Sequence, residues 1–223
     1  MIFKNNIFEK VCVENLYKSQ MQDGFSDETL LNFCPFTMSS ALKDEYKKDG
    51  FEKDYINSYL KSARILADSA MTICHPDNNC GISMLLSRDN VTIPMLYMVR
   101  HTLELSIKYA IECIDGNFKE VHGLIKLWNS FCFYLPNNCS GKERSILKKM
   151  CEFLEYIDLL DATGTKLRYP KDRNGYTQNE FRWINPINIV DTTERFIEQL
   201  YILDIEKIKC MKQNDVKGGN INA

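Results

Sequence analysis

Apolar residues recur every three or four positions over several stretches of the chain. This spacing places them on one face of an α-helix, so each stretch is predicted to be a helix that buries that face. The pattern therefore predicts a mainly α-helical bundle. The predicted helices cover residues 53–73, 92–114, 121–134, 142–160 and 189–211, with a short one near 41–48.

Two connecting segments lack this spacing. Residues 75–90 are rich in turn-forming residues, and Thr92 followed by Pro94 is typical of a helix start, so the central helix is predicted to begin near 92. Residues 161–188 carry Gly, Pro, Asn and Arg with aromatics between them. This composition predicts a short irregular or β-hairpin insertion.

The ends of the chain are less regular. Residues 1–30 fit either a strand or an amphipathic helix, and residues 213–223 are predicted to be a disordered tail. No repeat or long linker interrupts the remainder. We therefore expect one helical domain over residues 1–212.

Composition narrows the function. Lys and Arg number 28 against 30 Asp and Glu, for a net charge of -2, so a whole-chain basic footprint for nucleic acid is missing, although a local patch stays open. The chain has no apolar run long enough for a membrane span and no signal peptide, which predicts a cytoplasmic protein. Its nine Cys are scattered without a Cys-x-x-Cys pair, which indicates buried thiols in a reducing compartment.

Ionisable residues gather on the apolar helix predicted at 92–114. Arg100, Glu104 and Lys108 stand at i, i+4 and i+8 on one face, and His101 is one step round from Arg100. His122 opens the next predicted helix. Two interpretations stay open: an internal ion-pair network, or a site in which His101 and His122 form an acid/base pair.

The insertion mixes basic and aromatic residues. Such a mixture suits single-stranded nucleic acid, because basic groups meet phosphates and aromatic rings stack on bases. It equally suits a loop that folds back on the bundle. Cys74, His75 and Cys80 do not have standard zinc spacing, and phosphate-loop, dinucleotide and serine-hydrolase motifs are missing, so we expect neither a metal nor a cofactor. The residues of this mixture are Lys166, Arg168, Tyr169, Lys171, Arg173, Tyr176, Arg182 and Trp183.

Three strings carry a resemblance. They are Arg100-His101-x-Leu103-Glu104-Leu105-x-x-Lys108, then His122-Gly123-Leu124-x-x-Leu127-Trp128, then Arg168-Tyr169-Pro170-Lys171-Asp172-Arg173-Asn174-Gly175. In this order they resemble HEPN-like helical proteins of prokaryotic phage-defence and toxin–antitoxin systems. The resemblance implies a helical bundle, often dimeric, whose active members are metal-independent ribonucleases.

The chain departs from that family in one respect. Active members have an Arg, then four to six intervening residues, then a His, and none of His75, His101 or His122 has such an Arg before it. Two functions therefore stay open: a ribonuclease with a non-standard site, or a catalytically inactive module that serves dimerisation or partner binding, or senses a nucleotide. Expected partners are RNA or a nucleotide, a second copy of the chain, and an antitoxin protein.

The ribonuclease interpretation assigns each candidate a role. His101 and His122 are the acid/base candidates, and Arg100 holds phosphate while Glu104 orients a neighbour. Substrate contacts are expected from Lys108, Arg168, Tyr169, Asp172 and Arg173.

Overall fold

The computed structural model describes residues 51–72, 82–117, 120–137, 139–161, 167–168 and 184–211. The chain divides into two compact units, Met1–Glu45 and Tyr46–Ala223, and every described residue belongs to the second. Within these residues all regular elements are helices, which confirms the predicted mainly α-helical bundle. Residues 1–30, the tail and nearly all of the predicted hairpin lie outside the described residues. The single domain over 1–212 stays a prediction.

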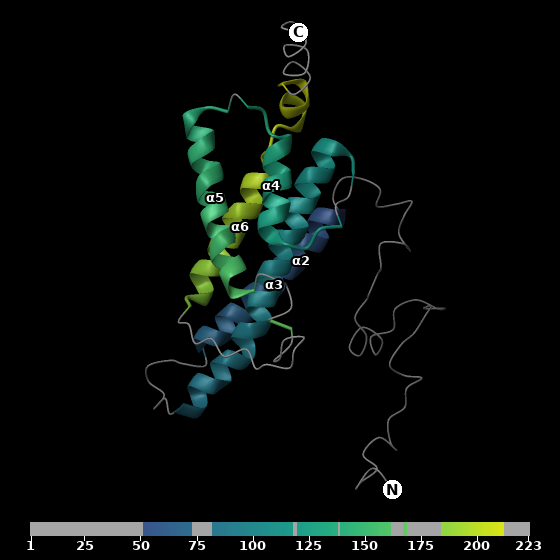
Figure 1. Ribbon diagram of the computed structural model, residues 1–223. Helices are drawn as coiled ribbons and strands as arrows, with labels where there is room; N and C mark the ends of the chain where they lie inside the picture. The colour runs from purple at the N-terminus through teal and green to yellow at the C-terminus, as the bar shows by residue number, and fades with distance from the viewer. Residues whose placement is uncertain are drawn as a thin grey trace, which may run out of the picture. The chain divides into compact units, whose positions relative to one another are not determined.

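Helices form the framework of the second unit (Figure 1). None of the described helices is both long and apolar enough to cross a membrane. A short helix at 205–211 follows the last labelled one. The labelled helices are α2 (Phe51–Thr72), α3 (Ile82–Asp115), α4 (Leu124–Tyr134), α5 (Gly141–Leu160) and α6 (Pro186–Tyr201).

Helices α2 and α3 pack as an antiparallel pair. The ammonium of Lys53 lies 5.7 Å from the Tyr109 ring centroid, and the Tyr59 ring lies 4.7 Å from His101. Residue numbers therefore increase along α2 in the direction in which they decrease along α3. The seam is apolar, because small residues of α2 meet a continuous buried row of α3. The buried residues of this seam are Ile56, Ala63, Ala67, Met95, Val99, Leu103 and Ile107.

Helix α3 begins at Ile82 rather than near Thr92, so the predicted start was wrong. Pro94 lies inside the helix, where it lacks the N–H that would reach the carbonyl of residue 90. The turn-like residues before it, Asp89 and Asn90, cost a formed helix only about 0.7 kcal/mol each relative to alanine. Weak local propensity therefore did not end the helix.

Two helices start at caps that the sequence encodes. Ser140 accepts from the Glu143 N–H at 3.2 Å, and the Glu143 carboxylate accepts from the Ser140 N–H at 2.6 Å, which forms a capping box before α5. Asn185 accepts from the Asn188 N–H at 3.1 Å, and Pro186 occupies the first turn of α6.

Helix α6 ends at Tyr201, so the predicted continuous helix to residue 211 was wrong. The helical conformation is interrupted at residues 202–204. Asp204 then caps the short helix by accepting from the Lys207 N–H at 3.0 Å. An aspartate followed by helix-forming residues is a start signal. The apolar spacing continues across residues 202–204, so the sequence pattern predicted one helix instead of two.

Helix α6 packs against α4 and α5 on one side and contacts α2 on the other. Phe196 lies 5.6 Å from the Trp128 ring of α4 and 6.3 Å from the Phe153 ring of α5. On its other side α6 is tied to α2, because Arg64 lies 2.6 Å from Asp191 and 3.0 Å from Glu194. Trp128 and Phe196 are almost fully buried, so their packing holds α4 and α5 against the α2–α3 pair.

Helix α5 offers a direct test of this core. Leu154 is fully buried, whereas Leu159 on the same helix is 61% exposed. Leu154→Ala removes buried apolar contacts and leaves a cavity, so it is expected to lower the free energy of unfolding by about 2–5 kcal/mol. Leu159→Ala is expected to change it by less than about 0.5 kcal/mol. Urea unfolding of both variants measures the difference, and equal losses would contradict the described packing.

Candidate functional site

Glu104 is the centre of a buried ionic cluster on α3. Its carboxylate accepts from Lys108 Nζ at 2.9 Å and from Arg100 Nη1 at 3.3 Å. The side chains of Arg100, Glu104 and Lys108 are only 6%, 7% and 6% exposed. The helical spacing that predicted a shared face is confirmed, and this face points into the bundle. One carboxylate thus serves two buried cations.

Arg100 also connects three parts of the chain. Its Nε donates to the Asp161 carbonyl at 3.0 Å, just past the end of α5. Its Nη2 donates to the His122 carbonyl at 2.9 Å, just before α4. A planar guanidinium suits this role because its donors are fixed relative to one another. Arg100 therefore positions the backbone of His122.

The His122 ring contacts the buried cluster through one nitrogen, and its side chain is otherwise largely exposed to solvent. Its Nδ1 lies 2.8 Å from Glu104 Oε1, although the side chain is 74% exposed. An ionised carboxylate only accepts hydrogen bonds, so Nδ1 donates the proton. The other nitrogen, Nε2, is then left available to an outside group. A histidine oriented by a buried carboxylate is a recurrent arrangement for proton transfer.

Opposing effects set the protonation of Glu104. Burial would raise the pKa of Glu104, but hydrogen bonds from Lys108 and His122 outweigh burial and hold the pKa below its ordinary value of 4.5. Glu104 is therefore ionised at neutral pH. It stays a permanent acceptor for both cations and for the His122 ring.

His101 lies in a different environment on the same helix. Its ring stacks on Tyr97 with centroids 5.9 Å apart and meets the Tyr59 ring edge-on at 4.7 Å. Burial lowers the pKa of His101; Glu104 opposes this, while Lys108, Arg100 and Arg168 lower the pKa further. His101 is therefore neutral at pH 7, a form that can accept a proton.

Two features of the site were missed at the sequence level. The Tyr55 hydroxyl lies 3.2 Å from that of Tyr59, which extends the His101 aromatic group along α2. Both tyrosines lie within the helix predicted at 53–73, and their i, i+4 spacing is the signal that could have indicated a stripe. Asp158 Oδ1 is buried without a hydrogen-bond partner among the described residues. Burial raises the pKa of Asp158, while Arg100 opposes it.

The structure brings most of the predicted site together. Arg100, His101, Glu104 and Lys108 share α3, and His122 joins them through Glu104. The donors of Arg100 and Lys108 contact groups of the protein, so their predicted phosphate contacts stay a prediction. Arg168 approaches this group, with its guanidinium carbon 6.0 Å from the Tyr97 ring centroid. Tyr169, Asp172 and Arg173 lie outside the described residues, as do Cys74, His75 and Cys80.

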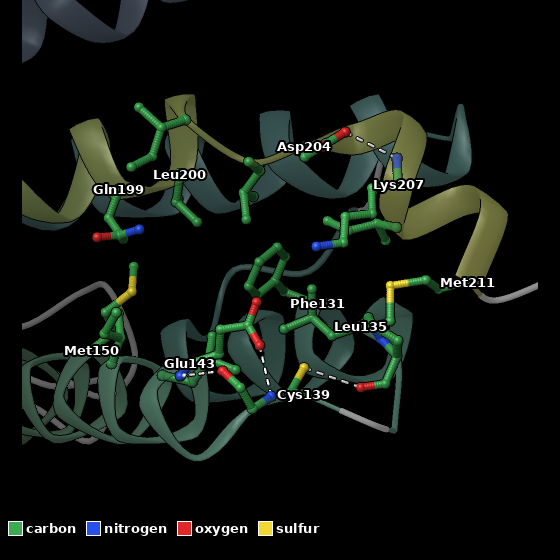
Figure 2. A pocket seen from close by; sticks show the side chains of 17 residues that line it. Phe131, Leu135, Cys139, Glu143, Met150, Gln199, Leu200, Asp204, Lys207 and Met211 are labelled. Atoms are coloured by element: carbon green, nitrogen blue, oxygen red, sulfur yellow. Dashed lines mark hydrogen bonds between the residues drawn. The ribbon is translucent and has the colours of Figure 1, made fainter.

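A separate cavity of about 400 Å³ opens between α4, α5, the end of α6 and the 205–211 helix. In Figure 2 the Lys207 side chain extends from one wall and Glu143 lies on the wall opposite, with Phe131 and Leu135 between them. Met150 and Met211 line its two ends (Figure 2). Thioether side chains adapt to differently shaped apolar groups. Within the described residues no group of three or more His, Cys, Asp or Glu side chains could hold a metal ion.

Removing the central carboxylate is expected to destabilise the fold strongly. Glu104→Ala leaves Arg100 and Lys108 buried without their shared acceptor, so the free energy of unfolding should fall by about 3–5 kcal/mol. The matched control is Glu152→Ala, which breaks an exposed Lys148–Glu152 pair of the same i, i+4 spacing, 3.8 Å apart. That loss should stay below about 0.5 kcal/mol. Denaturant titration compares the two, and a small loss in Glu104→Ala would show that the cluster adds little stability.

The cluster also predicts an acid limit of stability. Because the folded pKa of Glu104 lies below its ordinary value of 4.5, its contribution is complete above that value and is lost as pH falls through the folded pKa. Unfolding free energy should therefore fall more steeply below about pH 4.5 in the wild type than in Glu104→Gln. Denaturant unfolding between pH 3 and 7 measures both slopes. Parallel curves would remove Glu104 from the acid response.

Comparison with known proteins does not assign the chain to a family. No family model and no solved structure matches the chain. The chain is similar to the DNA mismatch repair protein MutS of Borreliella afzelii (strain PKo), with 24% identity over 220 residues. The match covers 85% of this chain, which spans about a quarter of that protein's length.

Proposed function

We propose that this chain is a HEPN-like ribonuclease of a prokaryotic antiviral-defence or toxin system that cleaves RNA without a metal. The observation that carries the proposal is the His122 ring, which Glu104 holds at Nδ1 while the side chain remains 74% exposed. Neutral His101 lies on the same helix as Glu104. Two imidazoles in different environments suit the two proton transfers of such a cleavage.

RNA supplies the nucleophile for the proposed reaction. A base removes the proton of a 2′-hydroxyl, and the oxygen then attacks the adjacent phosphorus. The bond from phosphorus to the 5′-oxygen breaks, and an acid protonates that leaving oxygen. The products are a 2′,3′-cyclic phosphate and a 5′-hydroxyl, with no net change in protons.

The environments of the two histidines suggest which one plays each role. His101 is the base candidate, because burial keeps its ring neutral. His122 is the acid candidate, because Glu104 holds its Nδ1 at 2.8 Å and leaves Nε2 as the nitrogen that can donate to the leaving oxygen. Glu104 and Arg100 position His122 from within the bundle, through the ring and the backbone carbonyl respectively.

The cellular setting belongs to the proposal as well. Resemblance to HEPN-like proteins supports a cytoplasmic toxin that acts as a homodimer and is silenced by a partner protein. Similarity to a protein named for DNA mismatch repair makes DNA the polymer to compare with RNA. The 2′-hydroxyl distinguishes the two, because the proposed reaction cannot start without it.

Cleavage in EDTA tests the proposal. Purified full-length protein should cut total RNA and tRNA in EDTA, leave single-stranded DNA intact, and produce 2′,3′-cyclic phosphate ends. His122→Ala and His101→Ala should each lower the rate by about 100-fold or more, because each removes one proton-transfer group. Gel analysis of labelled RNA measures the rates, and circular dichroism confirms that the variants fold. Cutting that persists in both variants would refute the site.

A second candidate function is a catalytically inactive interaction module or nucleotide sensor. The cavity beside Lys207 and the exposed apolar side chain of Ile202 in its lining favour this function, since Ile202 is 73% exposed. Here the Glu104 cluster serves only stability. A well-folded protein that cuts no RNA, yet binds a nucleotide in calorimetry or forms a dimer, would favour the second candidate over the first.

A further inference from the structure

We infer that Tyr55, Tyr59, His101 and Tyr97, with Arg168 at one end, form a stacking platform for unpaired nucleobases, so that the substrate is single-stranded RNA. This inference names the substrate class of the proposed ribonuclease and rests on that function. We call this row of side chains the aromatic stripe.

The rings of the aromatic stripe are continuous across two helices. Tyr55 and Tyr59 of α2 meet edge-to-face with centroids 5.2 Å apart, and Tyr59 meets His101 of α3 edge-to-face at 4.7 Å. His101 and Tyr97 are nearly parallel, at 6° and 5.9 Å. These separations lie within the range of favourable aromatic pairs. The contacts fix the orientation of each ring before any ligand arrives.

Exposure separates the aromatic stripe from the core. Tyr55 is 47% exposed and Tyr59, Tyr97 and His101 are half-buried, whereas Trp128 of the core is 2% exposed. Tyr and His are often partly exposed in proteins. A partly exposed ring that its neighbours hold in place can take a flat ligand on its outward surface.

Charge favours a nucleic acid as that ligand. The exposed Arg168 guanidinium lies 6.0 Å from the Tyr97 centroid, where it extends the aromatic stripe with a positive group. Arginine beside aromatic rings binds phosphates and also stacks on bases. The whole chain carries a net charge of -2, so its overall electrostatic field does not attract a polyanion. Attraction of phosphates would depend on a local positive group such as Arg168.

The aromatic stripe leads to the proposed catalytic residues. Tyr97, His101, Glu104 and Lys108 fall on one face of α3 by helical spacing. His101 belongs both to the aromatic stripe and to the proposed acid/base pair, and Glu104 holds His122 at 2.8 Å. A strand whose bases stack on the tyrosines would therefore bring its backbone to His101 and His122.

Stacking on side chains requires bases with an open face. Bases inside a duplex are stacked on both sides by their neighbours, whereas unpaired bases can move onto aromatic rings. Every base has such a face, so this binding tolerates sequence differences. The platform therefore selects strandedness rather than sequence.

Binding without cleavage tests the inference. Full-length His122→Ala protein is titrated against a fluorescein-labelled single-stranded RNA and against the duplex of the same sequence, with anisotropy as the readout. The single strand should bind at least tenfold more tightly. Tyr55→Ala in the same background should weaken single-strand binding by about tenfold, because it removes one stacking surface. Tyr55→Trp should restore it.

The control is an exposed tyrosine outside the aromatic stripe. Tyr156 of α5 is 41% exposed, close to Tyr55 in exposure, and Tyr156→Ala should leave binding unchanged. Equal affinity for single strand and duplex, or equal losses in Tyr55→Ala and Tyr156→Ala, would overturn the platform. RNA cutting by the wild type in that case would leave the ribonuclease standing. Selective, Tyr55-dependent binding without cutting would refute the ribonuclease and keep the platform.

Discussion

The burial of three ionisable groups on one helix is the constraint on which the site depends. Removing Arg100, Glu104 and Lys108 from water is costly, and mutual attraction repays the cost only when hydrogen bonds are nearly complete. Glu104 supplies the shared acceptor, and backbone carbonyls at Asp161 and His122 each accept a hydrogen bond from one of the other two Arg100 nitrogens. Those two carbonyls lie outside α3, so satisfying one arginine fixes how α4 and α5 enter and leave the bundle.

The same requirement gives His122 a defined place. Its carbonyl completes Arg100, and its ring completes Glu104. The ring is nevertheless 74% exposed, so the side chain that completes Glu104 also presents surface to solvent. A side chain that the buried cluster orients and that solvent can reach is well suited to act on an outside molecule. The geometry therefore separates a structural part, Arg100 and Lys108, from an outward part, His122.

Much of this arrangement could be predicted from local pattern. The i, i+4 spacing placed Arg100, Glu104 and Lys108 together, and apolar spacing predicted a helix over 142–160, one residue from the observed start of α5 at Gly141. The start of α3 at Ile82 could not be predicted, because a growing helix tolerates the weak formers before Pro94. Spacing also could not show that the charged face points inward, since a solvated stripe has the same sequence. Burial depends on α4 and α5, which lie far along the chain.

For the aromatic stripe too, apolar spacing could not show which side chains are buried, and here the side chains remain partly exposed. Tyr55 and Tyr59 fit the apolar rhythm of α2 as well as core residues do, yet they remain partly exposed. Their difference from Ile56 is a rotation of one position round the helix, from the seam to its edge. At that edge α3 presents His101 and Tyr97, so the two helices build one surface that neither encodes alone. In the proposed ribonuclease, this partly exposed aromatic edge would bind the bases, and the outward histidine beside it would transfer the proton.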